Sequence, residues 1–179
     1  MRDLTMLAHG LDAERGTCLA IIETPKGRRA KYDYDPETGL FRLAKLLPMG
    51  MCFPLDFGFV PSTLADDGDP LDVMVLGDEA CPVGALLEVR LIGVLEAEQT
   101  EQGKSVRNDR LLAVPVISHL YARIGKADDL DPTFVQHLSE FWINKARLEG
   151  KSFRILGVRG PAQAIALVRQ SAKPATTPP

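Results

Sequence analysis

The chain has 179 residues, of which 45% are hydrophobic and 25% are charged, and its net charge is −3. This length is typical of one domain with its own hydrophobic core, so we expect residues 1–179 to form a single domain. The acidic balance argues against a nucleic-acid partner, and the chain has no apolar run long enough to span a membrane. A small anionic substrate stays compatible with this composition, because a few basic side chains can bind phosphate whatever the total charge.

Residues 1–16 form an extension before the first apolar run. They include acidic residues and no sustained apolar stretch, so neither a secretory signal nor a transit peptide is indicated. The three cysteines, Cys18, Cys52 and Cys81, form no CxxC pair, and their odd number is typical of reduced thiols that serve as small core residues. We therefore expect the protein to be cytoplasmic.

Short apolar or alternating runs occupy residues 17–116, and turn residues separate them. Pro or Gly lies near most of the breaks. The runs are TCLAIIE, AKYDYD, GLFRLAKLL, FGFV, LDVMVL, ALLEVRLIGVL and RLLAVPVI. This spacing predicts a compact antiparallel sheet or a small barrel.

The C-terminal part of the chain changes to a helical pattern. Asp131 can cap a helix that has Pro132 at its first position, and large apolar residues recur at helical spacing as far as Gly150. Trp142 belongs to the core face of this helix. The run KSFRILGV predicts a further strand, GPAQAIALVRQSA predicts a second helix, and the composition of residues 172–179 predicts a disordered tail.

The two halves together predict a mainly β (α+β) fold. A β-barrel would hold the core, over about residues 17–171, and the helices would pack at its periphery. The chain contains no internal repeat and no linker that would divide it, which supports a single domain.

One acidic stretch, LADDGDPLDVMVL at residues 64–76, raises the question of function. Asp, Gly and Pro are ordinary turn residues, so one interpretation is a strand-entry turn with solvated carboxylates. A calcium-binding EF-hand is excluded, because Pro70 falls within the would-be loop and its sixth and twelfth positions lack the required Gly and Glu.

The spacing of Asp67, Asp69 and Asp72 favours a metal site over a plain turn. If the first part is extended, Asp67 and Asp69, which are two positions apart, point to the same side. Pro70 then turns the chain so that Asp72 swings back toward them, and Gly68 permits close backbone approach. Converging carboxylates repel one another unless a divalent cation binds, and oxygen ligands select Mg²⁺, Mn²⁺ or Ca²⁺.

The segment DDGDPLDVMVL resembles the signature D-x-D-P-x-D-V-x-V of the soluble family I inorganic pyrophosphatases. Other segments resemble the family in the same order over about residues 17–160: IIETPKG, AKYDYDPETGLF, FPLDFGFVPSTLADDGDP, LIGVL, LLAVP and FWINKARLEGK. The resemblance implies an OB-like five-stranded closed barrel with helices and hydrolysis of inorganic pyrophosphate to two orthophosphates. It also implies Mg²⁺ as the cofactor, with Mn²⁺ as an alternative, and a homo-oligomer, commonly a hexamer.

The resemblance further implies roles for individual residues. Asp67 and Asp72 would hold metal ions, and Asp69 would be the general base that takes a proton from the attacking water. Lys31 matches the family's phosphate-binding lysine, and Glu23 matches its buried glutamate near the metals.

Several family positions carry other residue types in this chain. Lys45 replaces a phosphate-binding arginine and lacks its bidentate fork, and Asp33 replaces a longer glutamate of the acidic set. Phe57 replaces a tyrosine whose hydroxyl contacts phosphate, a hydrogen bond worth roughly 1.5–3 kcal/mol. The Tyr-Lys pair that grips the second phosphate aligns with Lys145 and Ala146.

The second metal loop of the family is replaced by EQTEQGKSVRNDR. Its metal-binding aspartate becomes Asn108, with Asp109 one place later as the substitute, and its lysine becomes Arg110. A shift of one residue on a strand reverses the face of the side chain unless a bulge absorbs it. Glu98 and Glu101 could replace another acid of this loop.

These observations leave three functions open. The first is an active Mg²⁺-dependent pyrophosphatase. The changes at Phe57, Asn108 and Ala146 allow a second, a weakened or inactive relative that binds metal or polyanion or serves as a structural subunit. The third is a barrel that binds single-stranded nucleic acid, and both the acidic net charge and the single tryptophan count against it.

Overall fold

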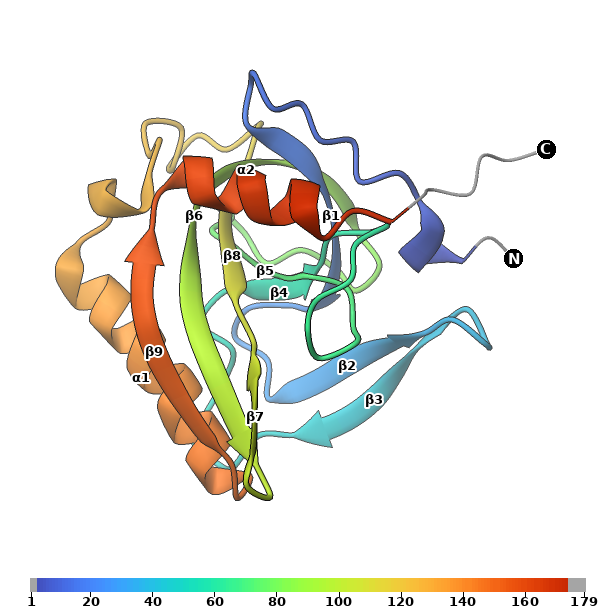
Figure 1. The fold of residues 1–179 in the computed structure, drawn as a ribbon, viewed down its shortest axis with the longest axis vertical. Coiled ribbons are helices and arrows are strands. Elements are labelled where there is room, and N and C mark those ends of the chain that lie inside the picture. Colours follow the sequence, from blue (N-terminus) through green and yellow to red (C-terminus); the bar gives the residue numbers. More distant parts are fainter. Residues whose placement is uncertain (1–2, 174–179) are drawn as a thin grey trace.

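The computed structural model describes residues 3–173. Within them a ring of five strands closes through the pairing of its first and last members (Figure 1). In ring order the strands are β1 (Thr17–Thr24), β4 (Asp56–Phe59), β5 (Asp72–Val75), β8 (Arg110–Pro115) and β6 (Leu86–Glu101). β5 and β8 are parallel, and the other neighbours in the ring are antiparallel. The predicted mainly β, OB-like fold is confirmed.

Two further strands extend this ring, and two others form a separate sheet. The polar second half of β6 pairs with β9 (Ser152–Arg159) on one side and with β7 (Lys104–Arg107) on the other. The apolar run had predicted this strand only to residue 95, because the continuation is mostly polar and is held by backbone pairing and by ion pairs of its glutamates. β2 (Ala30–Asp35) and β3 (Leu40–Leu46) form a separate two-stranded sheet.

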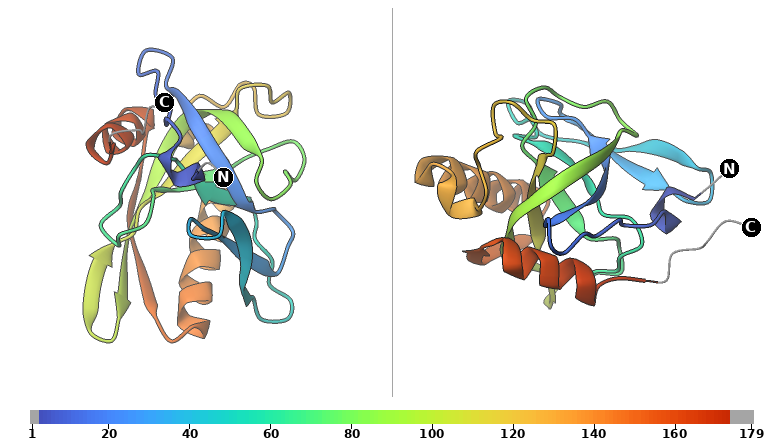
Figure 2. Two further views of the ribbon diagram at one scale, coloured as in Figure 1. Left: turned by 90° about the vertical axis from the view of Figure 1, so that its right-hand side faces the viewer. Right: turned by 90° about the horizontal axis from the view of Figure 1, so that it is seen from above.

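The helices lie outside the strand ring (Figure 2). α1 (Pro132–Leu148) contacts β9, and α2 (Pro161–Gln170) contacts β6, while two short 3₁₀ turns cover Leu4–Met6 (η1) and Ala127–Asp129 (η2). The Asp131 side chain accepts a hydrogen bond from Thr133 N at 2.7 Å, so the predicted cap of α1 is confirmed. The predicted second helix is confirmed as α2.

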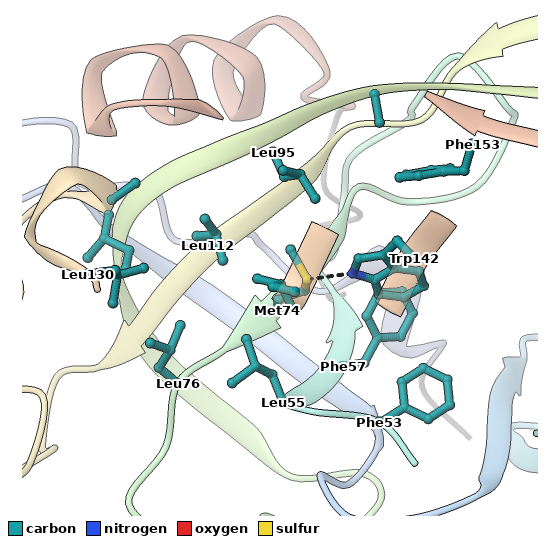
Figure 3. Packing of buried hydrophobic residues seen from close by; sticks show 14 of the residues in the cluster. Phe53, Leu55, Phe57, Met74, Leu76, Leu95, Leu112, Leu130, Trp142 and Phe153 are labelled. Carbon is teal, nitrogen blue, oxygen red and sulfur yellow. Dashed lines mark hydrogen bonds between the residues drawn. The ribbon is translucent and has the colours of Figure 1, made fainter. Parts of the chain in front are cut away.

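Neighbouring residues of the ring strands point to opposite faces and pack in two separate apolar clusters. On β5, Val73 packs in a cluster with Val168 of α2, whereas Met74 packs in the other cluster with Trp142 of α1. Figure 3 shows this second cluster, in which Trp142 Nε1 donates a hydrogen bond to Met74 Sδ at 3.1 Å. Trp142 is only 3% exposed, so its predicted core position is confirmed.

The ends of the described chain pack onto the ring. Leu19 N donates to His9 O at 2.7 Å, so the N-terminal extension adds backbone hydrogen bonds to β1. Ala172 pairs with Thr63 in an isolated bridge, so the predicted disordered tail does not begin at residue 172. Residues 174–179 of that predicted tail lie outside the described residues.

The cysteines are free thiols, but they do not share one environment. Cys18 is buried in β1, as predicted for a small core residue. The same prediction is wrong for Cys52, which is exposed, because the irregular segment before β4 turns the neighbouring Phe53 into the core instead.

Candidate active site

A cavity of about 200 Å³ lies where β1, β2 and the entrance of β5 meet. Four carboxylates and one lysine supply its charged wall: Glu23, Lys31, Asp33, Asp69 and Asp72. The remaining lining residues are Thr5, Tyr34, Phe59 and Pro70. The structure therefore brings five of the predicted site residues into one cavity, although they come from distant parts of the chain.

Hydrogen bonds to the end of β1 hold β2 in place at this cavity. Tyr34 N donates to Glu23 Oε1 at 2.7 Å, and Tyr32 N donates to Thr24 Oγ1 at 3.1 Å. Lys31 and Asp33 are two residues apart on β2, so their side chains point to the same side, where they form an ion pair. These hydrogen bonds from the backbone of β2 to side chains of β1 thus place both charges at the cavity.

The turn that carries Asp69 is held by hydrogen bonds between its own residues. Ala65 N donates to Asp69 O at 2.7 Å, and Asp69 N donates to Asp67 Oδ1 at 3.2 Å. The predicted extended conformation of this stretch is therefore wrong, and Asp67 lies exposed on the turn. Gly68 has a φ of 95°, and a Cβ there would meet nothing within 4 Å. Gly68 is thus required for its left-handed backbone and not, as predicted, for close approach.

Asp72, in contrast, is fixed by the strand ring. It is the first residue of β5 and pairs with Phe59 on one side and Arg110 on the other. Just before it, Leu71 N donates to Thr63 Oγ1 at 2.9 Å, which anchors the end of the turn. The site therefore combines a carboxylate on a rigid strand with Asp69 on an exposed turn.

The environment of the cavity disfavours charge on its carboxylates. Burial raises the pKa of Glu23 to about 7, against the opposing hydrogen bond from Tyr34 N and the charge of Lys31. Burial also raises the pKa of Asp72 to about 6, against the charges of Arg110 and Lys31. The pKa of Asp69 is raised by burial and then by the neighbouring charge of Asp67. A bound cation would reverse this penalty, because it favours the ionised carboxylates.

Arg110 is the buried counter-charge of Asp72. Its Nη2 lies 3.5 Å from Asp72 Oδ2, and the residue is only 5% exposed. Its guanidinium carbon lies 3.9 Å from the ring centroid of Trp142 and 4.5 Å from that of Phe153. Burial lowers the pKa of Arg110, and Asp72 opposes that shift. The aromatic rings thus hold a flat cation against the first residue of β5.

The predicted phosphate-binding residues of the β3 and α1 segments lie outside the cavity wall. Lys45 and Lys145 both form ion pairs with Glu149, at 3.2 and 2.9 Å. Phe57 is 3% exposed and packs against Trp142 with ring centroids 5.2 Å apart, as Figure 3 shows. Ala146 is also buried in the core.

The structure does not bring the predicted second acidic loop into the cavity. Asp109 Oδ1 accepts from Ala97 N at 2.9 Å and its Oδ2 accepts from Arg107 at 2.8 Å, so both oxygens already have donors. Glu98 pairs with Arg154 and Glu101 pairs with Lys151 on the surface of the β6 and β9 strands. One residue of the loop, Arg110, does reach the site.

Sequence reasoning missed three residues near the site. Thr5 reaches the cavity because Leu4 N donates to the Tyr34 hydroxyl at 3.1 Å, and no local pattern indicates that contact. Tyr34 belongs to the predicted strand AKYDYD, but its place in the wall depends on how β2 packs. Glu149 was detectable, because it lies four residues after Lys145 on a predicted helix, where an ion pair is expected.

The cavity residues suit a hard divalent cation as a donor set. Within residues 3–173, no three acidic, histidine or cysteine side chains already converge as metal ligands. The cavity nevertheless has four carboxylates on one wall, and oxygen donors of this kind are those that Mg²⁺ and Mn²⁺ prefer. Burial raises the pKa of Glu23, Asp69 and Asp72, so a bound cation would favour the ionised form of these three carboxylates.

Comparisons with known proteins identify the family that this chain resembles. The family model described as inorganic pyrophosphatase matches residues 20–176. The chain is 39% identical over 158 residues to an inorganic pyrophosphatase of a Nostoc species, covering 88% of this chain and 91% of that one. An inorganic pyrophosphatase of Methanosarcina acetivorans is 33% identical over 158 residues, with 88% and 92% covered. The crystal structure of inorganic pyrophosphatase from Thermus thermophilus superposes with a TM-score of 0.87 at 31% identity, covering 95% of this chain and 97% of that chain.

Proposed function

Because this chain belongs to the inorganic pyrophosphatase family, it hydrolyses inorganic pyrophosphate to two phosphates, and we propose that the reaction takes place in the cavity beside Asp69. The family uses a divalent metal, and we propose Mg²⁺, with Mn²⁺ as a replacement. The observation that supports this site is the group of carboxylates with raised pKa values around Lys31. The relatives give no support to the weakened or inactive alternative.

We propose Glu23, Asp33, Asp67 and Asp72 as the residues that hold the metal. Three of them line the cavity, and Asp67 is close enough to influence the pKa of Asp72. When bound, the divalent cation supplies charge that neutralises phosphate oxygens and lowers the pKa of the attacking water. Asp109 is left out of this set, because both of its carboxylate oxygens are hydrogen-bonded elsewhere.

Asp69 acts as the general base in this proposal. Its carboxylate takes one proton from water while the water oxygen forms a bond to one phosphorus. The bond between that phosphorus and the bridging oxygen breaks, and the electron pair leaves with the second phosphate. The exposed turn gives Asp69 contact with solvent water, and the raised pKa makes its carboxylate a better proton acceptor.

Basic side chains in and near the cavity bind the phosphate groups of the substrate. Lys31 binds phosphate oxygens in the cavity itself, and Lys45 and Lys145 bind the other phosphate. Arg110 orients Asp72 through its buried ion pair. Phe57 packs against Trp142 and so helps to fix the ring on which Arg110 stacks.

The assay is phosphate release from pyrophosphate with and without Mg²⁺, comparing the natural chain with Asp69→Asn. Loss of the general base should lower kcat by about 10²- to 10⁴-fold, since that is the usual contribution of such a base. Asp66→Asn, an exposed neighbour on the same turn, is the matched control and should keep full turnover. Equal rates for Asp69→Asn and the control would contradict the assigned role.

We also propose that the protein is a cytoplasmic homo-oligomer, with a hexamer as the specific expectation. Leu40, Leu43 and Leu46 on β3 are each 57–60% exposed, which supports contact with another copy. The free thiols of Cys18, Cys52 and Cys81 support a reducing compartment. Among residues 3–173, no helix has the length and apolar character needed to cross a membrane. Light scattering would give the molar mass, and cell fractionation would give the location.

A further inference from the structure

A single carboxylate, that of Glu149, holds both lysines assigned to the second phosphate. Its Oε2 lies 3.2 Å from Lys45 Nζ, and its Oε1 lies 2.9 Å from Lys145 Nζ. Lys45 is on β3 and Lys145 is on α1, so the two cations come from separate elements. A phosphate group would accept from two lysines in the same way, through two oxygens of one anion.

The helix dipole does not account for a carboxylate at this position. Glu149 is the C-terminal cap residue of α1, where the helix dipole favours cations and disfavours anions. The last turn already carries Lys145 and Arg147, which suit that end of the helix. The two lysines are what favour the anion. Although burial opposes them, Lys145 and Lys45 hold the pKa of Glu149 below its ordinary value.

The two lysines that contact Glu149 are linked to the acidic cavity through the side chains of Trp142 and Arg110. Lys145 Nζ lies 5.7 Å from the ring centroid of Trp142, and Arg110 stacks on the same ring at 3.9 Å. Arg110 in turn contacts Asp72 in the cavity wall. Glu149 therefore lies among cations that are linked, through Trp142 and Arg110, to Asp72 in the cavity wall.

We propose that Glu149 is an affinity-determining residue, a built-in anion that competes with the phosphate groups of substrate and product for Lys45 and Lys145. This inference rests on the proposed function, in which these lysines bind phosphate. Substrate must displace the carboxylate from both lysines in order to bind. After hydrolysis the carboxylate returns to them, which weakens the hold on phosphate and favours its release.

The test compares Glu149→Gln with the natural chain at fixed Mg²⁺. Glutamine keeps the size and hydrogen-bonding oxygen but removes the competing charge. The KM for pyrophosphate and the inhibition constant of inorganic phosphate should both fall roughly three- to tenfold, in line with the loss of two partly exposed ion pairs. The kcat should not rise, because phosphate that is held more tightly leaves more slowly. Glu140→Gln, an exposed carboxylate on the same helix, is the matched control and should change neither constant.

A measurement of phosphate binding tests the role of Glu149 without requiring the protein to turn over pyrophosphate. Trp142 is the single tryptophan of the chain and its ring lies 5.7 Å from Lys145 Nζ, so its fluorescence serves as the probe for phosphate binding at that lysine. The half-saturation concentration of inorganic phosphate should fall in Glu149→Gln by the same factor as the inhibition constant. Glu149→Asp keeps the charge and should bind phosphate more weakly than Glu149→Gln.

The opposite outcome would follow if Glu149 only joined β3 to α1. Loss of its charge would then loosen the lysines and raise KM, so an unchanged or raised KM overturns the inference. Equal phosphate affinity in Glu149→Asp and Glu149→Gln would also overturn it, because charge would then be irrelevant. Full turnover by Asp69→Asn is a separate result, which would refute the role of Asp69 as general base. The effect of Glu149→Gln on phosphate binding could still be measured by fluorescence.

Discussion

Replacing Glu23 by Gln should stabilise the metal-free protein at alkaline pH, although it removes a residue of the proposed metal site. Burial raises the pKa of Glu23 from 4.5 to about 7. Each tenfold change in proton affinity corresponds to about 1.4 kcal/mol, so ionising Glu23 above pH 7 destabilises the folded state by on the order of 3 kcal/mol. Glutamine has no charge to ionise, and its amide oxygen can still accept the hydrogen bond from Tyr34 N.

The direction with pH follows from the sign of this shift. Since the folded pKa is raised, the contribution of Glu23 to stability is fully present below about pH 4.5 and is lost as pH rises through 7. Carboxylates that do not interact with Glu23 contribute equally in both chains, so they cancel in the difference. For a chain of this size, about 3 kcal/mol corresponds to roughly 6–12 °C in Tm. The variant should therefore melt that much higher at pH 8 and at nearly the same temperature at pH 4.

Thermal unfolding followed by circular dichroism, with a chelator present, measures this difference from pH 4 to pH 8. Glu79→Gln changes an exposed carboxylate outside the site and should not produce a pH-dependent difference. Saturating Mg²⁺ should close the gap at pH 8, because the ionised Glu23 then has a counter-charge. A variant that melts no higher than the natural chain at pH 8 without metal, or a gap that is the same at every pH, would refute the reasoning.

Two further substitutions test how the site is held. Arg110→Lys should lower the free energy of unfolding by about 0.5–2 kcal/mol and raise the Mg²⁺ concentration needed for half-maximal activity, because a lysine cannot stack flat on Trp142 while pairing with Asp72. Urea unfolding and a Mg²⁺ titration measure both effects, and an equally stable variant would count against the stacking argument. Gly68→Ala should cost about 1 kcal/mol and lower kcat, since its φ of 95° is unfavourable for alanine and sets the position of Asp69. Unchanged kcat and stability would show that the turn tolerates the strain.

Local chemistry made much of the fold predictable. Apart from β7, which no apolar run predicted, the strands were visible as apolar or alternating runs, and α1 was visible from the Asp131 cap and Pro132, because these signals depend on neighbouring residues alone. The polar end of β6 was not visible, since backbone pairing with β7 and β9 replaces the apolar pattern there. Within the candidate site, the spacing of the aspartates indicated a common location for Asp67, Asp69 and Asp72, and the cavity contains the last two but not Asp67.

Other parts of the site depended on contacts that no local pattern encodes. Asp109 is turned toward Ala97 and Arg107 by the register of β8 against β6, and a shift of one residue decides that face. Thr5 reaches the cavity through a hydrogen bond between residues 30 positions apart.

By itself, the amino-acid sequence determined the order of strands and helices, the family resemblance and the acidic character of the site, because these follow from residue type and short-range spacing. Only the tertiary structure decided which charges face one another: Glu149 meets Lys45 from 104 residues away. It also decided that Glu23 and Asp72 lie in surroundings that resist their ionisation. Burial and long-range contacts are properties of the packed chain, since they arise only when distant segments exclude water together.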